Sequence, residues 1–219
     1  MSNFVLKKIL KRCLLFFAKT ARIYCMKIID AQYLTSVVDK NKLIDDDINE
    51  FAFVGRSNVG KSSIINNLTN KKSLAKTSSN PGHTRMINYF NINGGQFRFV
   101  DLPGYGYHKA GKGNERMWSS LIEKYLLNSQ CLKLVFMLVD IRHEPSELDK
   151  MMMRFLIETG LNFVVIATKA DKLSKAQQAI MKQKIASQLK IIPEMIVLHS
   201  SQTSQGREEI LNHIELLIN

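Results

Sequence analysis

The stretch "FVGRSNVGKSS", residues 53–63, decides the fold of this chain. It continues a short apolar run, "EFAFVG" (50–55), that is typical of a buried strand, and a helix is expected over residues 61–68. Between them, Gly55 to Ser62 matches the pattern GxxxxGK[ST]. The glycines allow the backbone to curl so that successive N–H groups point at phosphate oxygens, and the helix N-terminus adds its positive end. The sequence therefore predicts a phosphate-binding loop for a nucleoside triphosphate.

The side chains of this loop have separate expected tasks. Lys61 would reach the β- and γ-phosphates, and the Ser62 hydroxyl would ligate Mg²⁺ directly. The alternative is a glycine-rich turn before a helix, but the flanking strand and helix favour the phosphate loop. The predicted nucleotide contacts in this segment are Gly55, Arg56, Ser57, Asn58, Val59, Gly60, Lys61, Ser62 and Ser63.

The composition limits the class of protein. The chain has 219 residues and 45% hydrophobic content, which suits one domain with a sizeable core. No apolar run reaches the roughly 18 residues that cross a bilayer. Cys13, Cys25 and Cys131 form neither a disulfide framework nor a metal-binding spacing, which favours a reducing compartment. The net charge of +12 favours contact with phosphate-rich surfaces, either nucleic acid or an anionic membrane.

Apolar strands alternate with helical segments along the chain. Strands are expected at 50–55, 86–92, 97–102, 132–140, 162–168 and 194–200, and helices at about 61–68, 114–128, 145–160, 174–190 and 206–218. The turn signal "NGG" would join 86–92 and 97–102 as the one antiparallel pair. This alternation predicts a single α/β domain: a mostly parallel six-stranded sheet with one antiparallel strand and helices on both faces.

The segment "TKAD", residues 168–171, is expected at the carboxyl end of a buried strand, where α/β sheets place their ligands. Asp171 can accept hydrogen bonds from both N1–H and the 2-amino group of guanine. Adenine has neither hydrogen, so Asp171 would reject it. Lys169 can lay its methylene stem along the face of the base. The tetrapeptide alone is a weak signal, but its place downstream of the phosphate loop supports a guanine-binding motif.

The segment "DLPGYG", residues 101–106, is expected to end another strand. Asp101 would hold Mg²⁺ through a water molecule, and the Gly104 N–H is placed to sense the γ-phosphate. Between this segment and the phosphate loop, Thr84 in "SNPGHTR" is the candidate for a direct Mg²⁺ ligand that binds only when the γ-phosphate is present. The nearby hydroxyl groups of residues 77–79 are rivals for that role. A Pro-Gly turn without a ligand is the alternative interpretation of 101–106.

Together these segments resemble the P-loop GTPases, and more closely the EngB-type (YihA/YsxC) ribosome-biogenesis GTP-binding proteins. The strings that show the resemblance are "GRSNVGKSS", "PGHTR", "DLPGYGY", "DIRH" (140–143), "TKADKLS" and the "SS" at 200–201. The resemblance covers about residues 27–219 and leaves out the basic N-terminal segment.

The resemblance implies a compact GTPase that binds GTP and GDP with Mg²⁺ and hydrolyses GTP slowly. It implies a role in assembling the large ribosomal subunit, with the subunit precursor and its RNA as partners, and a need for the protein in normal cell division and septation. It supports Thr84 as the Mg²⁺ ligand and places residues 82–86 along the γ-phosphate. The resemblance suggests that the backbone N–H of Ser201 meets guanine O6. Beyond the phosphate loop, the expected GTP site then comprises Gly82, His83, Thr84, Arg85, Met86, Asp101, Leu102, Pro103, Gly104, Thr168, Lys169, Ala170, Asp171, Ser200 and Ser201.

Three positions depart from the pattern of many GTPases. Tyr105 follows Gly104 where many GTPases keep a glutamine that orients the attacking water, so the catalytic group is not identified and hydrolysis should be slow. Asn58 stands where potassium-stimulated relatives use an asparagine to ligate K⁺, which would supply positive charge near the phosphates. Asparagine also suits a tight loop for backbone reasons, so both interpretations of Asn58 stay open. Gln202 replaces a lysine that is common in the final motif.

The N-terminal residues 1–25 stand apart from the predicted GTPase domain, residues 26–219. They contain six Lys and Arg residues and no Asp or Glu, mixed with Leu, Ile and Phe. They fit an amphipathic surface helix, a transit-like presequence, or an upstream extension without a role, with Met26 as the functional start.

Three functions compete. The first is a nucleotide switch that acts on a pre-ribosomal particle in the cytoplasm, as a monomer without stable membrane insertion. The second is a nucleoside kinase, which "TKAD" and the lone-threonine loop disfavour. The third is a GTPase recruited to a membrane by residues 1–25.

The basic run 107–116, "YHKAGKGNER", is either an RNA-contacting loop or a solvated one.

Overall fold

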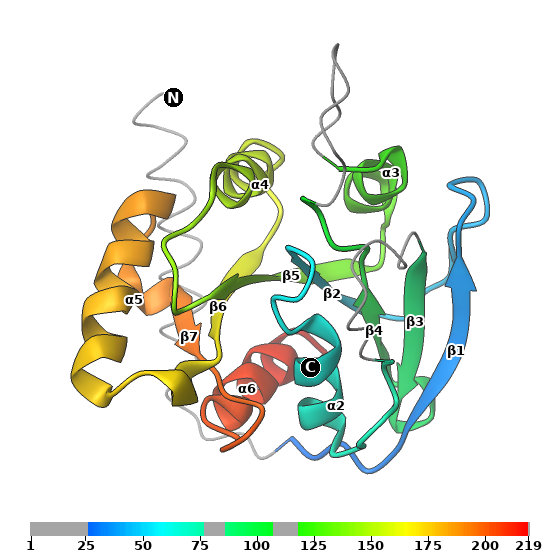
Figure 1. Ribbon diagram of the computed structural model, residues 1–219. Helices are drawn as coiled ribbons and strands as arrows, with labels where there is room; N and C mark the ends of the chain where they lie inside the picture. The colour runs from blue at the N-terminus through cyan, green and yellow to red at the C-terminus, as the bar shows by residue number, and fades with distance from the viewer. Residues whose placement is uncertain (1–25, 77–85, 107–117, 219) are drawn as a thin grey trace.

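The computed structural model describes residues 26–76, 86–106 and 118–218. Its centre is a seven-stranded sheet with the strand order β1-β3-β4-β2-β5-β6-β7 (Figure 1). Strand β3 runs antiparallel to both of its neighbours, and every other adjacent pair is parallel. The strands are β1 (Ala31–Val37), β2 (Glu50–Gly55), β3 (Ile87–Ile92), β4 (Phe97–Asp101), β5 (Leu132–Asp140), β6 (Phe163–Thr168) and β7 (Ile196–Leu198). The predicted fold class, a mostly parallel α/β sheet with one antiparallel strand, is confirmed.

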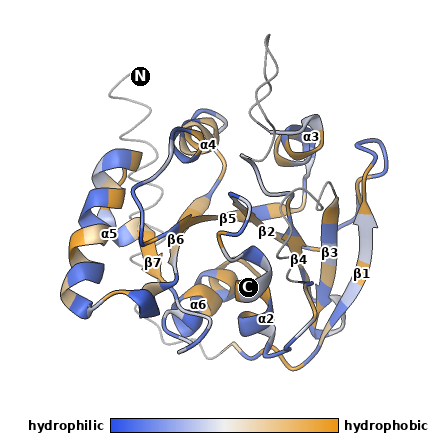
Figure 2. Ribbon diagram, in the orientation of Figure 1, coloured by the Kyte–Doolittle hydropathy of each residue, from blue (hydrophilic) through white to orange (hydrophobic). Residues whose placement is uncertain are grey.

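Helices cover both faces of the sheet, as the figure shows. They are α2 (Lys61–Thr69), α3 (Ser120–Asn128), α4 (Glu147–Glu158), α5 (Lys175–Leu189) and α6 (Arg207–Ile218), with short 3₁₀ turns η2 (Asn93–Gly95), η3 (Ala170–Lys172) and η4 (Pro193–Met195). Helices α2 and α6 pack on one face and α3, α4 and α5 on the other, each over its own cluster of buried side chains. Strands β2 and β6 are buried along their whole length, so both clusters draw on them. Figure 2 shows hydrophobic residues concentrated in the central strands and hydrophilic ones prevailing along α5.

The prediction of six strands is wrong by one, because β1 was not expected. Only Ala31 and Val37, at the two ends of β1, are buried, so the strand lacks a continuous apolar run. A bulge between Tyr33 and Thr35 also interrupts the alternation that marks a half-buried strand. As an edge strand, β1 needs only β3 as a neighbour, and its pairing is set by contacts about fifty to sixty residues away in the sequence.

Several element boundaries also differ from the prediction. The helix expected from about 114 begins, within the described residues, at Ser120, where the Ser119 side chain accepts a hydrogen bond from the Ile122 N–H. The strand expected over 194–200 is shorter, because Pro193 opens a 3₁₀ turn before it. The glycine expected at the end of helix α4 is confirmed, since Gly160 has φ 70° after the helix ends.

The carboxyl ends of the parallel strands meet at one edge of the sheet. Phe53 pairs with Asp101, and Asp140 pairs with Thr168, so β2, β4, β5 and β6 finish side by side. The loops that follow these strands are the segments that the sequence singled out for nucleotide binding. None of the described helices combines the length and the apolar character that a membrane crossing requires.

Candidate nucleotide-binding site

The loop of residues 55–62 leaves β2 and turns directly into α2. Two of its residues have left-handed backbone, Asn58 with φ 62° and Gly60 with φ 113°. Gly60 is the residue before the helix, and its φ strongly favours glycine. Asparagine is among the few other residues that tolerate the left-handed region, so the backbone alone explains Asn58. The curled path is the one that a phosphate-binding nest requires.

Residues 102–106 run beside this loop. The Tyr105 N–H donates to the Gly55 carbonyl over 3.3 Å, and the Ser57 N–H donates to the Tyr105 carbonyl over 3.2 Å. Gly104 lies so close that a Cβ there would be 2.9 Å from the Ser57 nitrogen. The absence of a side chain at Gly104 therefore permits the two segments to touch, which places its N–H next to the phosphate loop.

Lys61 and Asp101 lie at the centre of the site. Burial lowers the pKa of the Lys61 ammonium, although the nearby Asp101 charge opposes this. Burial raises the pKa of Asp101, although the Lys61 charge and a hydrogen bond from Ser62 oppose it. Asp101 is buried with one carboxylate oxygen that has no hydrogen-bond partner among the described residues, and Lys61 lies half-buried beside it. A buried carboxylate beside a cation is expected of a site that receives charged phosphates and a metal ion.

The donor set fits Mg²⁺. The Oδ1 atom of Asp101 is buried and has no hydrogen-bond partner among the described residues, and the Ser62 hydroxyl lies next to this carboxylate. Hydroxyl and carboxylate oxygens together with phosphate oxygens are the ligands that Mg²⁺ prefers, and the ion commonly keeps several waters. Ser62 could thus bind Mg²⁺ directly and Asp101 through water.

The predicted guanine motif is fastened to the phosphate loop. The Thr168 hydroxyl donates to the Val59 carbonyl over 2.7 Å, and the Lys169 ammonium donates to the Asn58 carbonyl over 3.0 Å. Lys169 itself has φ 61°, a left-handed residue that turns the chain back toward the loop. The two motifs, more than a hundred residues apart in sequence, therefore form one site.

Asp171 is held in one orientation by the loop that follows β7. The Ser200 hydroxyl donates to its Oδ1 over 2.6 Å, and this hydrogen bond lowers the pKa of Asp171, so the group is a carboxylate that only accepts hydrogen bonds. Lys172 lies 3.1 Å from its Oδ2. Ser200 is fully buried and accepts hydrogen bonds from the backbone N–H groups of Gln202 and Thr203. The "SS" segment thus lies against the predicted guanine motif.

Three residues that make contacts within the site, namely Asn67, His199 and Asp140, were missed by the sequence analysis. Asn67, on α2, donates to the Ser204 hydroxyl over 3.0 Å, and its Oδ1 lies 3.0 Å from the His199 Nε2. These contacts tie the loop after β7 to the helix that follows the phosphate loop. Asp140, at the end of β5, pairs with Lys169 over 2.9 Å. A strand-end carboxylate in "DIRH" was a usable signal for Asp140, whereas nothing in the sequence marked Asn67 or His199.

Tyr105 does not replace the water-orienting glutamine of other GTPases. Its side chain is buried, and its hydroxyl donates to Asp149 Oδ1 on α4 over 2.8 Å. The phenol is therefore engaged by a helix and is not available to an attacking water. This geometry agrees with the expectation that no residue at this position activates water.

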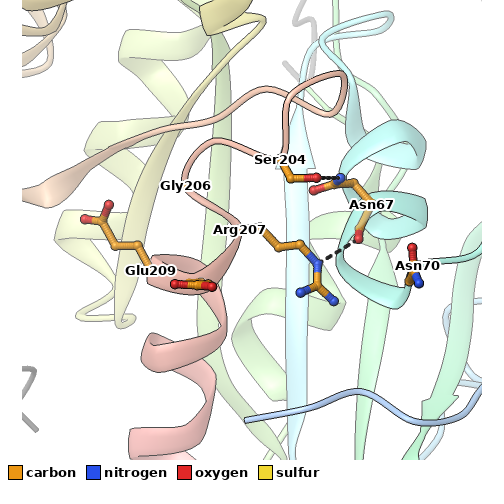
Figure 3. Close-up of a pocket in the computed structure, with 7 residues that line it drawn as sticks. Asn67, Asn70, Ser204, Gly206, Arg207 and Glu209 are labelled. Atoms are coloured by element: carbon orange, nitrogen blue, oxygen red, sulfur yellow. Dashed lines mark hydrogen bonds between the residues drawn. The ribbon is translucent and has the colours of Figure 1, made fainter. Parts of the chain in front are cut away.

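A groove of about 540 Å³ lies next to the site, between the end of α2 and the start of α6. Figure 3 shows Arg207 and Ser204 hydrogen-bonded to Asn67 across it. Arg207 also donates to the Leu68 carbonyl over 2.8 Å, so its guanidinium caps the end of α2. Because the remaining lining includes the carboxylates of Glu208 and Glu209, this groove is a poor phosphate site.

Several predicted contacts lie outside the described residues: Gly82, His83, Thr84 and Arg85, together with the basic loop 107–116. Met86, the next residue, is exposed immediately before β3. Three further expected contacts, Leu102, Pro103 and Ala170, are buried. Ser63 and Ser201 line a smaller hollow beside α2.

Comparison with known proteins identifies the family to which this chain belongs. Residues 50–169 match the model of the MMR_HSR1 family, described as 50S ribosome-binding GTPase. The chain is 45% identical over 194 residues to "Probable GTP-binding protein EngB" of Desulforamulus reducens, covering 88% of this chain and 95% of the relative. It is 45% identical over 195 residues to the protein of the same name from Fusobacterium nucleatum, covering 89% and 100%.

The solved structures agree on the fold. A crystal structure of a probable GTP-binding protein engB has a TM-score of 0.61 at 24% identity, over 77% of this chain and 98% of that one. At this identity the likeness concerns the fold alone, and the assignment to a family rests on the family model and the sequence relatives. The chain belongs to the EngB family of GTP-binding proteins, within the 50S ribosome-binding GTPases.

Proposed function

We propose that this GTPase is a nucleotide switch that binds GTP and GDP with Mg²⁺, hydrolyses GTP slowly, and acts in assembly of the large ribosomal subunit. The observation that supports this best is the Asp171 carboxylate, held by Ser200 at 2.6 Å beside a phosphate loop to which the same motif is hydrogen-bonded. That arrangement suits a ligand with a guanine at one end and phosphates at the other.

The proposed chemistry follows from the positions of the side chains. The loop N–H groups and Lys61 would bind the phosphates, while Asp171 accepts hydrogen bonds from N1–H and the 2-amino group of guanine. Mg²⁺ would neutralise charge on the β- and γ-phosphates when bound, held by Ser62, by Asp101 through water and, in the GTP form, by Thr84. The Gly104 N–H would report the γ-phosphate through the contact of residues 102–106 with the loop.

Hydrolysis is proposed to be slow, because Tyr105 stands where many GTPases keep the water-orienting glutamine and its hydroxyl is bound to Asp149. K⁺ held by Asn58 is one way to supply the missing positive charge. GTP turnover measured in potassium chloride and in sodium chloride at equal ionic strength tests this role. A K⁺ ligand at Asn58 predicts faster turnover in potassium chloride, whereas a purely backbone role of Asn58 predicts equal rates.

The ribosomal assignment rests on the name of the matched family, on the EngB relatives, and on the net charge of +12, which favours RNA. We further propose that the protein is cytoplasmic and monomeric, that residues 26–219 form the GTPase domain, and that its loss disturbs cell division and septation.

Calorimetric titration tests the nucleotide assignment. GDP should bind with micromolar or tighter affinity, and ADP should not bind detectably. Asp171→Asn should lose GDP and gain xanthosine diphosphate, because an amide can donate to the 2-oxo group of xanthine. Equal binding of GDP and ADP by the unaltered protein would contradict guanine recognition.

Co-sedimentation with large ribosomal subunits tests the partner. Substituting Lys109, Lys112 and Arg116 together by Ala should weaken binding and leave GDP affinity unchanged. Lys175, Lys182 and Lys184 on α5 provide a control of matched charge, whose replacement should leave subunit binding intact. Equal co-sedimentation of both triple variants would show that the loop of residues 107–116 is not part of the interface with the subunit.

A membrane-recruited GTPase is the second candidate, because residues 1–25 contain six cations and no acid. Flotation with anionic vesicles, with and without those residues, separates the two proposals. Vesicle binding that disappears on deletion would favour membrane recruitment.

A further inference from the structure

The end of β5 carries an ion network that the nucleotide chemistry described so far does not use. The Asp140 side chain is 16% exposed and faces two cations. Arg142 donates to it through Nε over 2.9 Å, Nη2 over 2.7 Å and its backbone N–H over 3.1 Å. Lys169 lies 2.9 Å from Oδ2. The fork of Arg142 fixes the plane of the carboxylate, and the carboxylate in turn faces Lys169.

Lys169 links this network to the phosphate loop. Its ammonium donates to the Asn58 carbonyl over 3.0 Å while it pairs with Asp140. Two of its three N–H donors are therefore used by fixed partners, one on the loop and one on β5. The four-carbon stem between the ammonium and the left-handed backbone of Lys169 is stretched across the space between the guanine motif and the loop.

A free lysine side chain samples many rotamers, and its methylene groups then do not stay packed against the face of a planar base. The Asn58 carbonyl alone is a neutral acceptor, whereas Asp140 adds a charged one. Burial opposes the charge of Asp140, but the hydrogen bonds from Arg142 and Lys169 hold the pKa of this carboxyl well below its usual range. The Asp140 carboxylate therefore stays ionised throughout the neutral and mildly acidic pH range.

We propose that Asp140 is a positioning residue for the guanine nucleotide: it fixes Lys169 so that its stem lies against the face of the base, and Arg142 fixes Asp140. This inference rests on the proposed nucleotide site and adds a residue of "DIRH" to it. Asp140 does not read the edge of the base, which is the task of Asp171. It therefore affects affinity without affecting the choice between purines.

The test is a double-mutant cycle on the full chain with GDP as the probe. Asp140→Asn keeps the shape of the side chain and removes its charge, and it should weaken GDP binding about tenfold, mainly by faster dissociation. In a Lys169→Met background the same substitution should have less than about a twofold effect, because the group that it positions is gone. Glu147→Gln, which removes an exposed ion pair with Lys150 on α4, is the matched control and should bind GDP as the unaltered protein does.

Inosine diphosphate distinguishes positioning from general disorder of the site. It lacks the 2-amino group, so the preference for GDP over it reports the contact with Asp171. Asp140→Asn should weaken both nucleotides by the same factor and keep that preference, whereas a collapsed site would lose it. Unchanged GDP affinity in Asp140→Asn, an equal loss in the Lys169→Met background, or a lost preference would each overturn the inference. Failure of the unaltered protein to bind GDP would instead overturn the proposed function and this inference with it.

Discussion

The Tyr105 hydroxyl donates a hydrogen bond to Asp149 Oδ1 over 2.8 Å, and this contact joins the segment beside the phosphate loop to the first turn of α4. The other oxygen of Asp149 accepts from the N–H and the hydroxyl of Ser146, which completes the capping box of that helix. Tyr105 is thus part of a helix terminus, although its sequence position is that of a catalytic residue in other GTPases.

Tyr105→Phe should lower the free energy of unfolding by about 1–2 kcal/mol, because it leaves a buried carboxylate oxygen without its donor. GTP turnover should not change, since the phenol faces α4. Urea unfolding and phosphate release measure the two effects. Tyr105→Gln should likewise give no faster turnover; a clear increase would show that the side chain at this position reaches the attacking water.

Gly104→Ala should weaken binding of a non-hydrolysable GTP analogue by about tenfold or more and GDP by less. The added Cβ would lie 2.9 Å from the Ser57 backbone, and the segment must move away from the phosphate loop to relieve the contact. Gly160→Ala is the control, because it is strained by its φ of 70° but meets no atom within 4 Å. Equal losses of analogue and GDP in Gly104→Ala would contradict a γ-phosphate contact at this residue.

Asn67→Ala should speed release of GDP by about tenfold or more, because about 1 kcal/mol is lost for each of its two hydrogen bonds to the loop after β7. The loop would keep its own turn around Ser200 but lose the side-chain contacts of Ser204 and His199 with α2. Stopped-flow displacement of a fluorescent GDP measures the rate. Asn128→Ala, exposed at the end of α3, should leave it unaltered; a rate that stays constant in Asn67→Ala as well would show that the loop is held by other contacts.

His199 should make the fold less stable at acidic pH. Burial lowers its pKa to about 4, against an ordinary value of 6.5, although the charge of Asp171 opposes the shift. A depressed histidine pKa favours the fold above the unfolded value, so the stabilisation is full above pH 6.5 and is lost as the pH falls toward 4. The loss should reach up to about 3 kcal/mol.

The measurement is urea unfolding without nucleotide between pH 7.5 and 4.5. His199→Gln should flatten the pH dependence relative to the unaltered protein, and the difference isolates this residue from Glu50, whose pKa is raised mainly by burial and which acts in the opposite direction. Parallel curves for the two proteins would show that His199 is as easily protonated in the fold as in the unfolded chain.

Much of the fold and the site could be predicted because the relevant signals are local. The phosphate loop requires glycine and lysine within eight residues, and Gly60 has the left-handed backbone that this spacing implies. Strands buried on both faces, such as β5 and β6, appear as continuous apolar runs. Edge strand β1 has no such run, and the expected helix start near 114 failed because the cap at Ser119 is a single weak signal.

The sequence by itself determined the class of fold and the phosphate loop, and it predicted Asp171 as the carboxylate that reads guanine, because each of these features is specified by a few neighbouring residues and their period. The tertiary structure alone decided which distant groups meet: Asn58 with Lys169, Asp140 with the same lysine, and Tyr105 with Asp149. These contacts depend on the order in which strands pair in the sheet. Periodicity records which face of a strand is buried, but it contains no information about the neighbour on either side.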